Sequence, residues 1–422
     1  MIAPRTTIAV WPSFSTVGLE IAESLQFMKN IKLVGISDDT SHPLSNLYDE
    51  VLHVPHLSQV IHRIDLDLSK FIIFPAHDYV LDYISDNVNL TYIGSRRDTI
   101  KLLRDKYKTN EFLEQSLLKQ YSLTNIKINA ESHFPIYCKP RFGYGGQNHR
   151  LINGLEDFNS MEGSDEFVYQ EILHGEEYSV ECFTDRDRNL IHIAPRVRKR
   201  VRMGTALSFE QPAKQIEDQL KSIAVEINSL IDLRGPWYFQ MKQNRAGDLR
   251  ILEISPRIPG SAIWSRAKGV NLSEISIWDY LNYSVENSKS LMSIRIEREL
   301  ASYGSIVESY QHVYIDLDDT IIVNGKIHPR ILAFIIQERN EGKTIHLITK
   351  SLKTNLNAYL KDMKIFQFFD EIIHLKQEQS KHCFINFSNS IFIDDSFSER
   401  EMVWKNRKIP VFSPDLIRLL VR

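Results

Sequence analysis

The sequence predicts an α/β protein of about three domains, with one parallel sheet near its start and another near its end. Short apolar runs alternate with helical patterns over residues 7–95, and the same alternation returns from residue 312. Such alternation is typical of parallel sheets covered by helices. The stretch between them is rich in strands with β-branched and aromatic residues, which indicates an α+β domain. At roughly 150 residues per domain, a chain of 422 residues fits this division.

The first domain is expected over residues 1–97. Its strands are predicted at TIAVW, IKLVGISD, FIIFPA and LTYIG, and TVGLEIAESLQFM is predicted to form an amphipathic helix after the first strand. A dinucleotide-binding fold carries a Gly-rich turn at that point, but this chain has WPSFSTVG. A dinucleotide cofactor is therefore not expected here.

The α+β domain is expected over residues 98–305. It begins with a charged helical stretch at 97–120, followed by the strands FPIYCKP, EFVYQEI and EYSVECFTD and by a helix at 213–231. GPWYFQMKQN and DLRILEISPR are predicted as two strands joined by the turn RAGD. A further helix, SEISIWDYLNYSV, precedes a linker near residues 300–311.

The third domain is expected over residues 310–422, as a smaller Rossmann-like α/β unit. Strands are predicted at VYIDLDD, TIHLITK, EIIHL and SIFIDDS, with helices at 329–340 and near 352–362.

Composition excludes several classes of protein. A net charge of −3 gives no overall field that would attract nucleic acid or an anionic membrane. No apolar run approaches the ~20 residues that span a bilayer, and the N-terminus has no long apolar stretch typical of a signal peptide. Cys138, Cys182 and Cys383 show no paired spacing, which indicates reduced thiols. We therefore expect a cytoplasmic protein without nucleic-acid or membrane partners.

A phosphate-binding pattern lies in CKPRFGYGGQN, where Lys139 ends a strand and Gly143, Gly145 and Gly146 follow. Glycines let backbone N–H groups approach a phosphate, and the lysine adds a positive charge. The alternative is a flexible hairpin without a ligand. Farther on, Gln240 and Glu253 are predicted on facing strands, and their oxygens suit Mg²⁺, with Mn²⁺ as a substitute.

The order of these elements over residues 5–290 resembles the ATP-grasp superfamily, close to its carboxylate-amine ligases and carbamoyl-phosphate synthetases. The resemblance implies an ATP site in which Lys106 of DKYKT and Lys139 are the two nucleotide lysines and GYGG covers the phosphates. It also implies further roles. Glu171 and Ile172 of the hinge QEIL would meet the adenine, and Glu177 would bind the ribose. Gln240 and Glu253 would bind the metal, and Arg257 would lie near the transferred phosphate.

Two of these assignments have ordinary structural alternatives. Lys106 could lie on a solvated helix face, and Gln240 could be a strand residue without a ligand. The family also has Asn where this chain has Ser255 in EISPR. A serine hydroxyl binds Mg²⁺ more weakly than an amide carbonyl does, so Ser255 is the weakest of the three expected metal ligands.

A basic tract, APRVRKRVRMG, follows the hinge region. Alternation along a strand predicts that Arg196, Arg198, Arg200 and Arg202 share one face. We expect this face to meet the γ-phosphate or an anionic substrate, with Arg202 as the first choice. A solvated face or a nucleic-acid patch is the alternative.

Two pairs of acids mark the third domain. Asp316 and Asp318 follow a buried strand, and being two residues apart they point to one side, so one can act as nucleophile and the other as general acid and base. Asp394 and Asp395 end another strand, and parallel strands bring such ends together. The alternative is a helix N-cap, which would explain only one acid. Asp319 is expected to begin a helix.

Over residues 310–422 the chain resembles the haloacid-dehalogenase-like (HAD) phosphatases. The resemblance implies that Asp316 attacks phosphorus, that Asp318 serves as acid and base, and that Thr349 and Lys381 hold the phosphate, with Lys376 as a rival for the lysine. Mg²⁺ would be held by Asp395 and Asp316, with Asp318 and either Asp394 or Glu399 beside them. The short interval after Asp318 leaves no room for a large cap domain, so an open site is expected.

Together these resemblances imply a bifunctional enzyme. One head would join a carboxylate to an amine through an acyl phosphate made from ATP, and the other would hydrolyse a phosphorylated metabolite. The alternative is an ATP-grasp kinase or a nucleotide-binding module joined to an active phosphatase. A homodimer is expected from the family alone.

Overall fold

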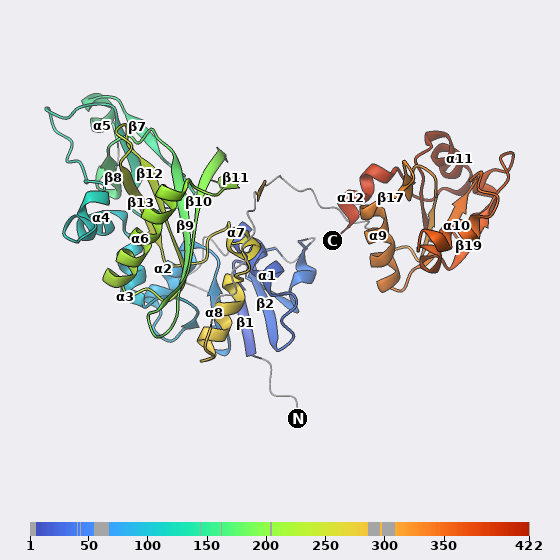
Figure 1. The fold of residues 1–422 in the computed structure, drawn as a ribbon, viewed down its shortest axis with the longest axis horizontal. Helices are drawn as coiled ribbons and strands as arrows, with labels where there is room; N and C mark the ends of the chain where they lie inside the picture. The colour runs from blue at the N-terminus through green and yellow to red at the C-terminus, as the bar shows by residue number, and fades with distance from the viewer. Residues whose placement is uncertain are drawn as a thin grey trace. The chain divides into compact units, whose positions relative to one another are not determined.

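The computed structural model of the protein describes residues 6–39, 41–42, 44–54, 67–143, 145–161, 163–202, 205–285, 296–297 and 309–421. The chain divides into two compact units, residues 1–299 and residues 300–422 (Figure 1). The finer domain boundaries expected above stay predictions. Of the helices described, none combines the length and the apolar character needed to cross a membrane.

The first unit begins with a five-stranded parallel sheet in the order β3-β2-β1-β4-β5. Its strands are β1 (Thr6–Trp11), β2 (Ile31–Ser37), β3 (Glu50–His53), β4 (Ile72–Pro75) and β5 (Thr91–Tyr92). One face packs against α2 (Asp78–Asp86) and α3 (Arg97–Arg104). The other packs against α1 (Thr16–Leu25) and against α8 (Leu272–Tyr280), which returns from the end of the unit.

A six-stranded antiparallel sheet forms the body of the unit, in the order β13-β12-β9-β10-β11-β14. The strands are β9 (Glu177–Thr184), β10 (Leu190–Arg202), β11 (Thr205–Glu210), β12 (Gly235–Gln243), β13 (Leu249–Ser255) and β14 (Ile296–Glu297). Alternate residues of β9, β10, β12 and β13 point to a core against α6 (Lys214–Leu230). The short helix α7 (Ile263–Ala267) follows β13.

A three-stranded antiparallel sheet, β7-β6-β8, completes the unit with a small core of its own. It comprises β6 (Ile136–Pro140), β7 (Arg150–Ile152) and β8 (Phe167–Gln170), accompanied by α4 (Lys106–Glu114) and α5 (Leu155–Asn159).

The single helical stretch expected over residues 97–120 is two helices. Asp105 separates α3 from α4, because its side chain accepts the backbone N–H groups of Tyr107 (3.0 Å) and Lys108 (3.4 Å) and so caps α4. Arg141 binds the same carboxylate at 2.6 Å and 3.2 Å. The break makes Lys106 the first residue of α4.

The second unit is a five-stranded parallel sheet in the order β19-β18-β15-β20-β21. Its strands are β15 (His312–Ile315), β18 (Thr344–Thr349), β19 (Glu371–His374), β20 (Ser390–Ile393) and β21 (Val411–Phe412), and a hairpin joins β16 (Ile322–Val323) to β17 (Lys326–Ile327). Its helices are α9 (Pro329–Asn340), α10 (Leu356–Asp362), α11 (Phe397–Arg407) and α12 (Ile417–Leu420).

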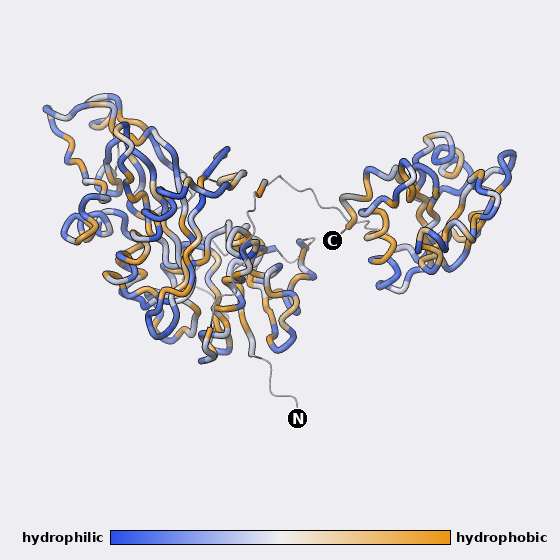
Figure 2. Tube along the Cα trace, in the orientation of Figure 1, coloured by the Kyte–Doolittle hydropathy of each residue, from blue (hydrophilic) through white to orange (hydrophobic). Residues whose placement is uncertain are grey.

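Hydrophobic residues gather along the inner strands of each unit, and hydrophilic residues dominate the outer loops (Figure 2). In the second unit, apolar residues on the two faces of the parallel sheet form two separate cores. A strand buried on both faces carries few polar residues, so acids at the ends of such strands are unusual.

Candidate functional site

A cavity of about 1080 Å³ lies on the face of the antiparallel sheet opposite α6. It is lined by every residue that the sequence assigned to ATP: Lys106, Lys139, Gly143, Gly145, Gly146, Glu171, Ile172 and Glu177. Gln240, Glu253 and Arg257 line it too. Segments about 150 residues apart in the sequence, from α4 to the end of β13, therefore meet at one place.

A β-bulge brings Glu253 to the cavity. Gln240 pairs with Glu253, but the next pair is Met241 with Ile251, so Leu252 is an extra residue in β13. Met241 and Ile251 are buried in the core against α6. Side chains two apart on a regular strand share a face, so without the bulge Glu253 would follow Ile251 into that core.

The bulge also supplies a hydrogen-bond acceptor for Lys139. The Nζ of Lys139 donates to the carbonyl oxygen of Leu252 at 3.0 Å. Burial and, less strongly, the nearby charge of Lys106 lower the pKa of Lys139 to about 8, against the opposing charge of Glu253. A buried ammonium held by a single carbonyl is under-solvated, so an anion in the cavity would stabilise it.

Lys106 lies beside the glycine loop. Its Nζ donates to the carbonyl oxygen of Gly143 at 3.0 Å, and burial lowers the pKa of this lysine as well. Gly145 and Gly146 have φ of +62° and +72°, the left-handed region that favours glycine. The sequence placed glycines where the backbone requires them.

Arg257 lines the cavity with its side chain 11% exposed and forms a short ion pair with Asp78. Its Nη2 is 2.6 Å from Oδ2 of Asp78, and Nη1 of Arg104 is 3.2 Å from the other oxygen. Burial would raise the pKa of Asp78, but the two guanidinium groups hold it well below its usual range. Arg257 thus stays charged and fixed in position.

The basic tract divides into buried and exposed parts. Arg196 and Arg198 line the cavity, where they pair with Glu181 (3.3 Å) and Glu177 (3.1 Å). Arg200 is exposed and has φ of +45°, which interrupts the regular alternation that predicted one shared face. Arg202 belongs to β10, but its side chain lies outside the described part of the chain.

Ser255, an expected metal ligand, is buried but does not line the cavity. Its partner across the sheet is Tyr238, whose side chain lines the cavity instead. Gln240 and Glu253 are therefore the two expected metal ligands that face the cavity.

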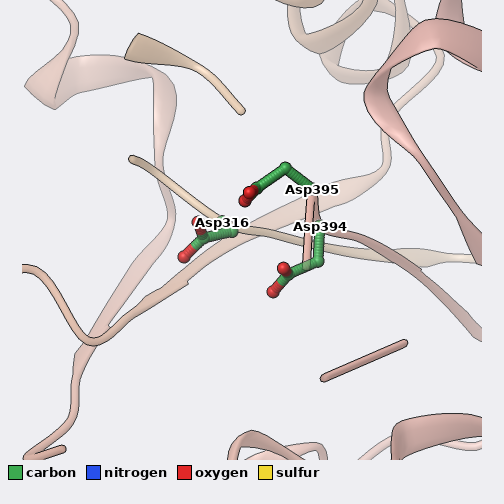
Figure 3. Close-up of side chains that lie close together, drawn as sticks. All are labelled: Asp316, Asp394 and Asp395. Carbon is green, nitrogen blue, oxygen red and sulfur yellow. The ribbon is translucent and has the colours of Figure 1, made fainter. Parts of the chain in front are cut away.

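A second group of candidate residues lies in the second unit, at the carboxyl ends of β15 and β20. The carboxylates of Asp316, Asp394 and Asp395 each have an oxygen within 4.8 Å of the others, and Figure 3 shows them gathered at one place. Oxygen ligands of this kind suit Mg²⁺. Asp318 is half-buried and does not belong to this group.

Lys381 bridges two of these acids. Its Nζ is 2.6 Å from Asp316 and 2.6 Å from Asp394, and all three side chains are buried. Burial raises the pKa of Asp316 to about 7, although the charge of Lys381 opposes the rise. The rival Lys376 is exposed.

Three further residues singled out in the sequence of this unit, Thr349, Glu399 and Asp319, lie in other surroundings. Thr349 is buried at the end of β18, and its hydroxyl accepts the N–H of Ser351 at 3.1 Å. Glu399 pairs with Lys350 at 2.6 Å. Asp319 does not begin a helix: it has φ of +57° in a turn before β16, and the next helix, α9, begins at Pro329.

Comparisons with known proteins concern the first unit. Residues 164–299 match the family model described as ATP-grasp in the biosynthetic pathway with Ter operon. A biotin carboxylase in complex with β,γ-ATP from Campylobacter jejuni is similar over 67% of this chain and 72% of its own, with 16% identity and a TM-score of 0.55. N5-carboxyaminoimidazole synthetase from Staphylococcus aureus with ADP is similar over 68% and 80%, with 18% identity and a TM-score of 0.52. The first unit has the ATP-grasp fold.

A third structure similar to the ATP-grasp unit is the biotin carboxylase domain dimer of the 2-oxoglutarate carboxylase from Hydrogenobacter thermophilus, with MgADP, ADP and bicarbonate. It covers 67% of this chain and 71% of its own, with 14% identity and a TM-score of 0.56. No curated protein sequence matches the chain.

Sequence reasoning missed several residues that line the cavity of the ATP-grasp unit. They are Gln170, Ser179, Tyr238, Lys242, His77 and His149. Ser179 follows Glu177 by two residues on β9, so strand alternation alone could have found it. His77 follows β4 of the first sheet, and no local pattern links that position to the nucleotide residues.

Proposed function

We propose that the ATP-grasp unit is an ATP-dependent ligase that activates a carboxylate as an acyl phosphate and transfers the acyl group to an amine. The observation that carries this proposal is the single cavity that collects both lysines, the glycine loop, the hinge and the paired Gln240 and Glu253. The nucleotide complexes among the similar structures, with β,γ-ATP and ADP, support a nucleotide in this cavity.

In this proposal each group has a role that follows from its position. Lys106 and Lys139 bind the phosphates, and the hinge at Glu171 and Ile172 meets the base. Gln240 and Glu253 offer oxygens that suit Mg²⁺, which would neutralise charge on the phosphates when bound. Arg257, held by Asp78, stabilises charge on the transferred phosphoryl group.

The test is to incubate the protein with ATP, Mg²⁺ and candidate carboxylates, and to add hydroxylamine in place of the amine. An acyl phosphate gives a hydroxamate, whereas a phosphorylated alcohol does not. ADP release without a hydroxamate for any acid would favour the kinase. Nucleotide binding without turnover would favour the binding module, an alternative that the position of Ser255 away from the cavity supports.

We propose further that the second unit is a HAD-like, Mg²⁺-dependent phosphomonoesterase. The gathered carboxylates of Asp316, Asp394 and Asp395, the first two bridged by Lys381, support this. Asp316 would attack phosphorus to form an aspartyl phosphate, Asp318 would protonate the leaving oxygen and then activate water, and Thr349 would help to hold the phosphate.

Asp316→Asn tests whether the two heads are separate. We expect hydrolysis of p-nitrophenyl phosphate to fall at least about 100-fold, because the nucleophile is lost, while ATP binding stays unchanged. Equal loss of both activities would contradict separate sites. The same assays with different candidate compounds test the identities of the acid, the amine and the phosphate ester. Size-exclusion chromatography of the intact chain tests for a homodimer.

A further inference from the structure

Four side chains form one row across the floor of the cavity. Glu253 pairs with Gln240, Gln240 with Ser179, and Ser179 with Arg196, each directly opposite its neighbour on an adjacent strand. All four line the cavity. Residues directly opposite in an antiparallel sheet share a face, with Cβ atoms about 5 Å apart. Ser179 therefore lies between an expected metal ligand and a buried cation.

Ser179 is 1% exposed, and among the residues that the structure describes its hydroxyl has no hydrogen-bond partner. A buried hydroxyl without a partner costs free energy that alanine would avoid. Two buried hydroxyls of the same unit are bonded, Thr184 to Asn228 at 2.6 Å and Ser265 to Glu181 at 2.6 Å. The hydroxyl of Ser255 also lacks a hydrogen-bond partner among the described residues, but Ser255 does not line the cavity. Because Ser179 does line it, we take a ligand in the cavity as the partner of its hydroxyl.

The neighbours of Ser179 indicate the chemistry of that ligand. On one side Gln240 and Glu253 suit a divalent cation, and on the other Arg196 carries a positive charge. A group that lies between a cation site and a guanidinium is an anion, and a serine hydroxyl donates to it. In the proposed ligase the anion that passes there is the phosphoryl group in transfer.

We propose that the hydroxyl of Ser179 donates a hydrogen bond to a non-bridging oxygen of the phosphoryl group as it moves from ATP to the carboxylate. The bond from phosphorus to the β–γ bridging oxygen breaks and its electron pair leaves with ADP, while a carboxylate oxygen bonds to phosphorus. The proton of Ser179 stays on its oxygen. This inference deepens the proposed ligase function and rests on it.

The test uses ADP with Mg²⁺ in the presence and absence of aluminium fluoride, which imitates the phosphoryl group in transfer, and measures affinity by titration calorimetry. Wild-type protein should bind ADP more tightly with aluminium fluoride. Ser179→Ala should bind ADP alone with an affinity within about twofold of wild type. The factor by which aluminium fluoride increases that affinity should be at least about tenfold smaller than in wild type. Ser276→Ala is the control, because Ser276 is equally buried but bonded to Leu272 within α8.

Stability separates this role from a structural one. Without nucleotide, Ser179→Ala should unfold at the same temperature as wild type or higher, since it removes an unpartnered polar group. A clear fall in the unfolding temperature, or a full aluminium fluoride gain in Ser179→Ala, would overturn the inference. So would a wild-type protein that binds ADP without any such gain. Failure of the wild type to bind ADP at all would instead reject the proposed ligase.

Discussion

At the scale of single residues, we expect Lys139 to make nucleotide affinity depend on pH. Burial lowers its pKa from 10.5 to about 8 in the nucleotide-free protein. Only the charged form attracts phosphate, so ATP affinity should be highest below pH 8 and fall about three- to tenfold by pH 9. Titration calorimetry at a series of pH values measures this.

Lys139→Met is the matched variant for that pH dependence. It should bind ATP much more weakly, with an affinity that no longer changes between pH 7 and 9. In the wild type, pH affects stability in the opposite direction. Between pH 8 and 10.5 Lys139 holds a proton in the unfolded chain but not in the folded chain. Lys139 therefore makes the nucleotide-free fold more stable as pH rises. A pH dependence that survives in the variant would assign it to another group.

Lys381 holds two buried carboxylates together. Lys381→Met should lower the free energy of unfolding of the second unit by about 3–5 kcal/mol near neutral pH, because Asp316 and Asp394 lose their counter-charge. The loss should shrink at pH 5.5, below the pKa of about 7 of Asp316, because protonation removes the charge of that carboxylate. Urea unfolding measures this. Lys376→Met, at an exposed position, should change stability by less than about 0.5 kcal/mol.

Residue types, more than contacts, could be predicted from the sequence. The lysines, the glycines and the pairs of acids were found because their chemistry is rare in those settings. The ion pairs of Arg257 with Asp78 and Arg198 with Glu177 join residues from different strands and loops. No local pattern specifies such partners, because tertiary packing decides them.

At the scale of elements, the break at Asp105 positions Lys106, the first of the two lysines proposed to bind the nucleotide. Asp105→Ala should cost about 0.5–2 kcal/mol of stability through the lost helix cap and should also weaken ATP binding, because α4 begins with Lys106. Asn271→Ala is the control variant. The side chain of Asn271 caps α8 by accepting the N–H of Glu274, and Asn271 does not line the cavity. Urea unfolding and titration calorimetry on both variants separate the two effects.

Equal nucleotide affinity in Asp105→Ala and Asn271→Ala would contradict that role for the break. The sequence could not show the break, since residues 97–114 carry helical patterning throughout, and Asp105 divides the helix through hydrogen bonds that only the structure shows. By contrast, the helix expected at 329–340 is α9 with the same bounds, because His328 and Pro329 mark its start and Gly342 lies just beyond its end.

At the scale of the whole molecule, two compact units with separate cores should unfold separately. Calorimetry of the intact chain should show two transitions. ATP with Mg²⁺ at about 100 times its dissociation constant should stabilise one of them by about 2.7 kcal/mol and leave the other unchanged. A single transition that shifts as one would show that the units are energetically coupled.

The extra residue in β13 sets where the chain tolerates a change of length. The turn between β12 and β13 is exposed, so one residue added or removed there alters only the loop. Adding one residue between Leu249 and Glu253 would instead move Glu253 by one position and send it into the apolar core, whereas removing Leu252 would take away the carbonyl oxygen that Lys139 binds. Among related chains, we expect insertions and deletions to collect in that turn and to spare the five residues after it.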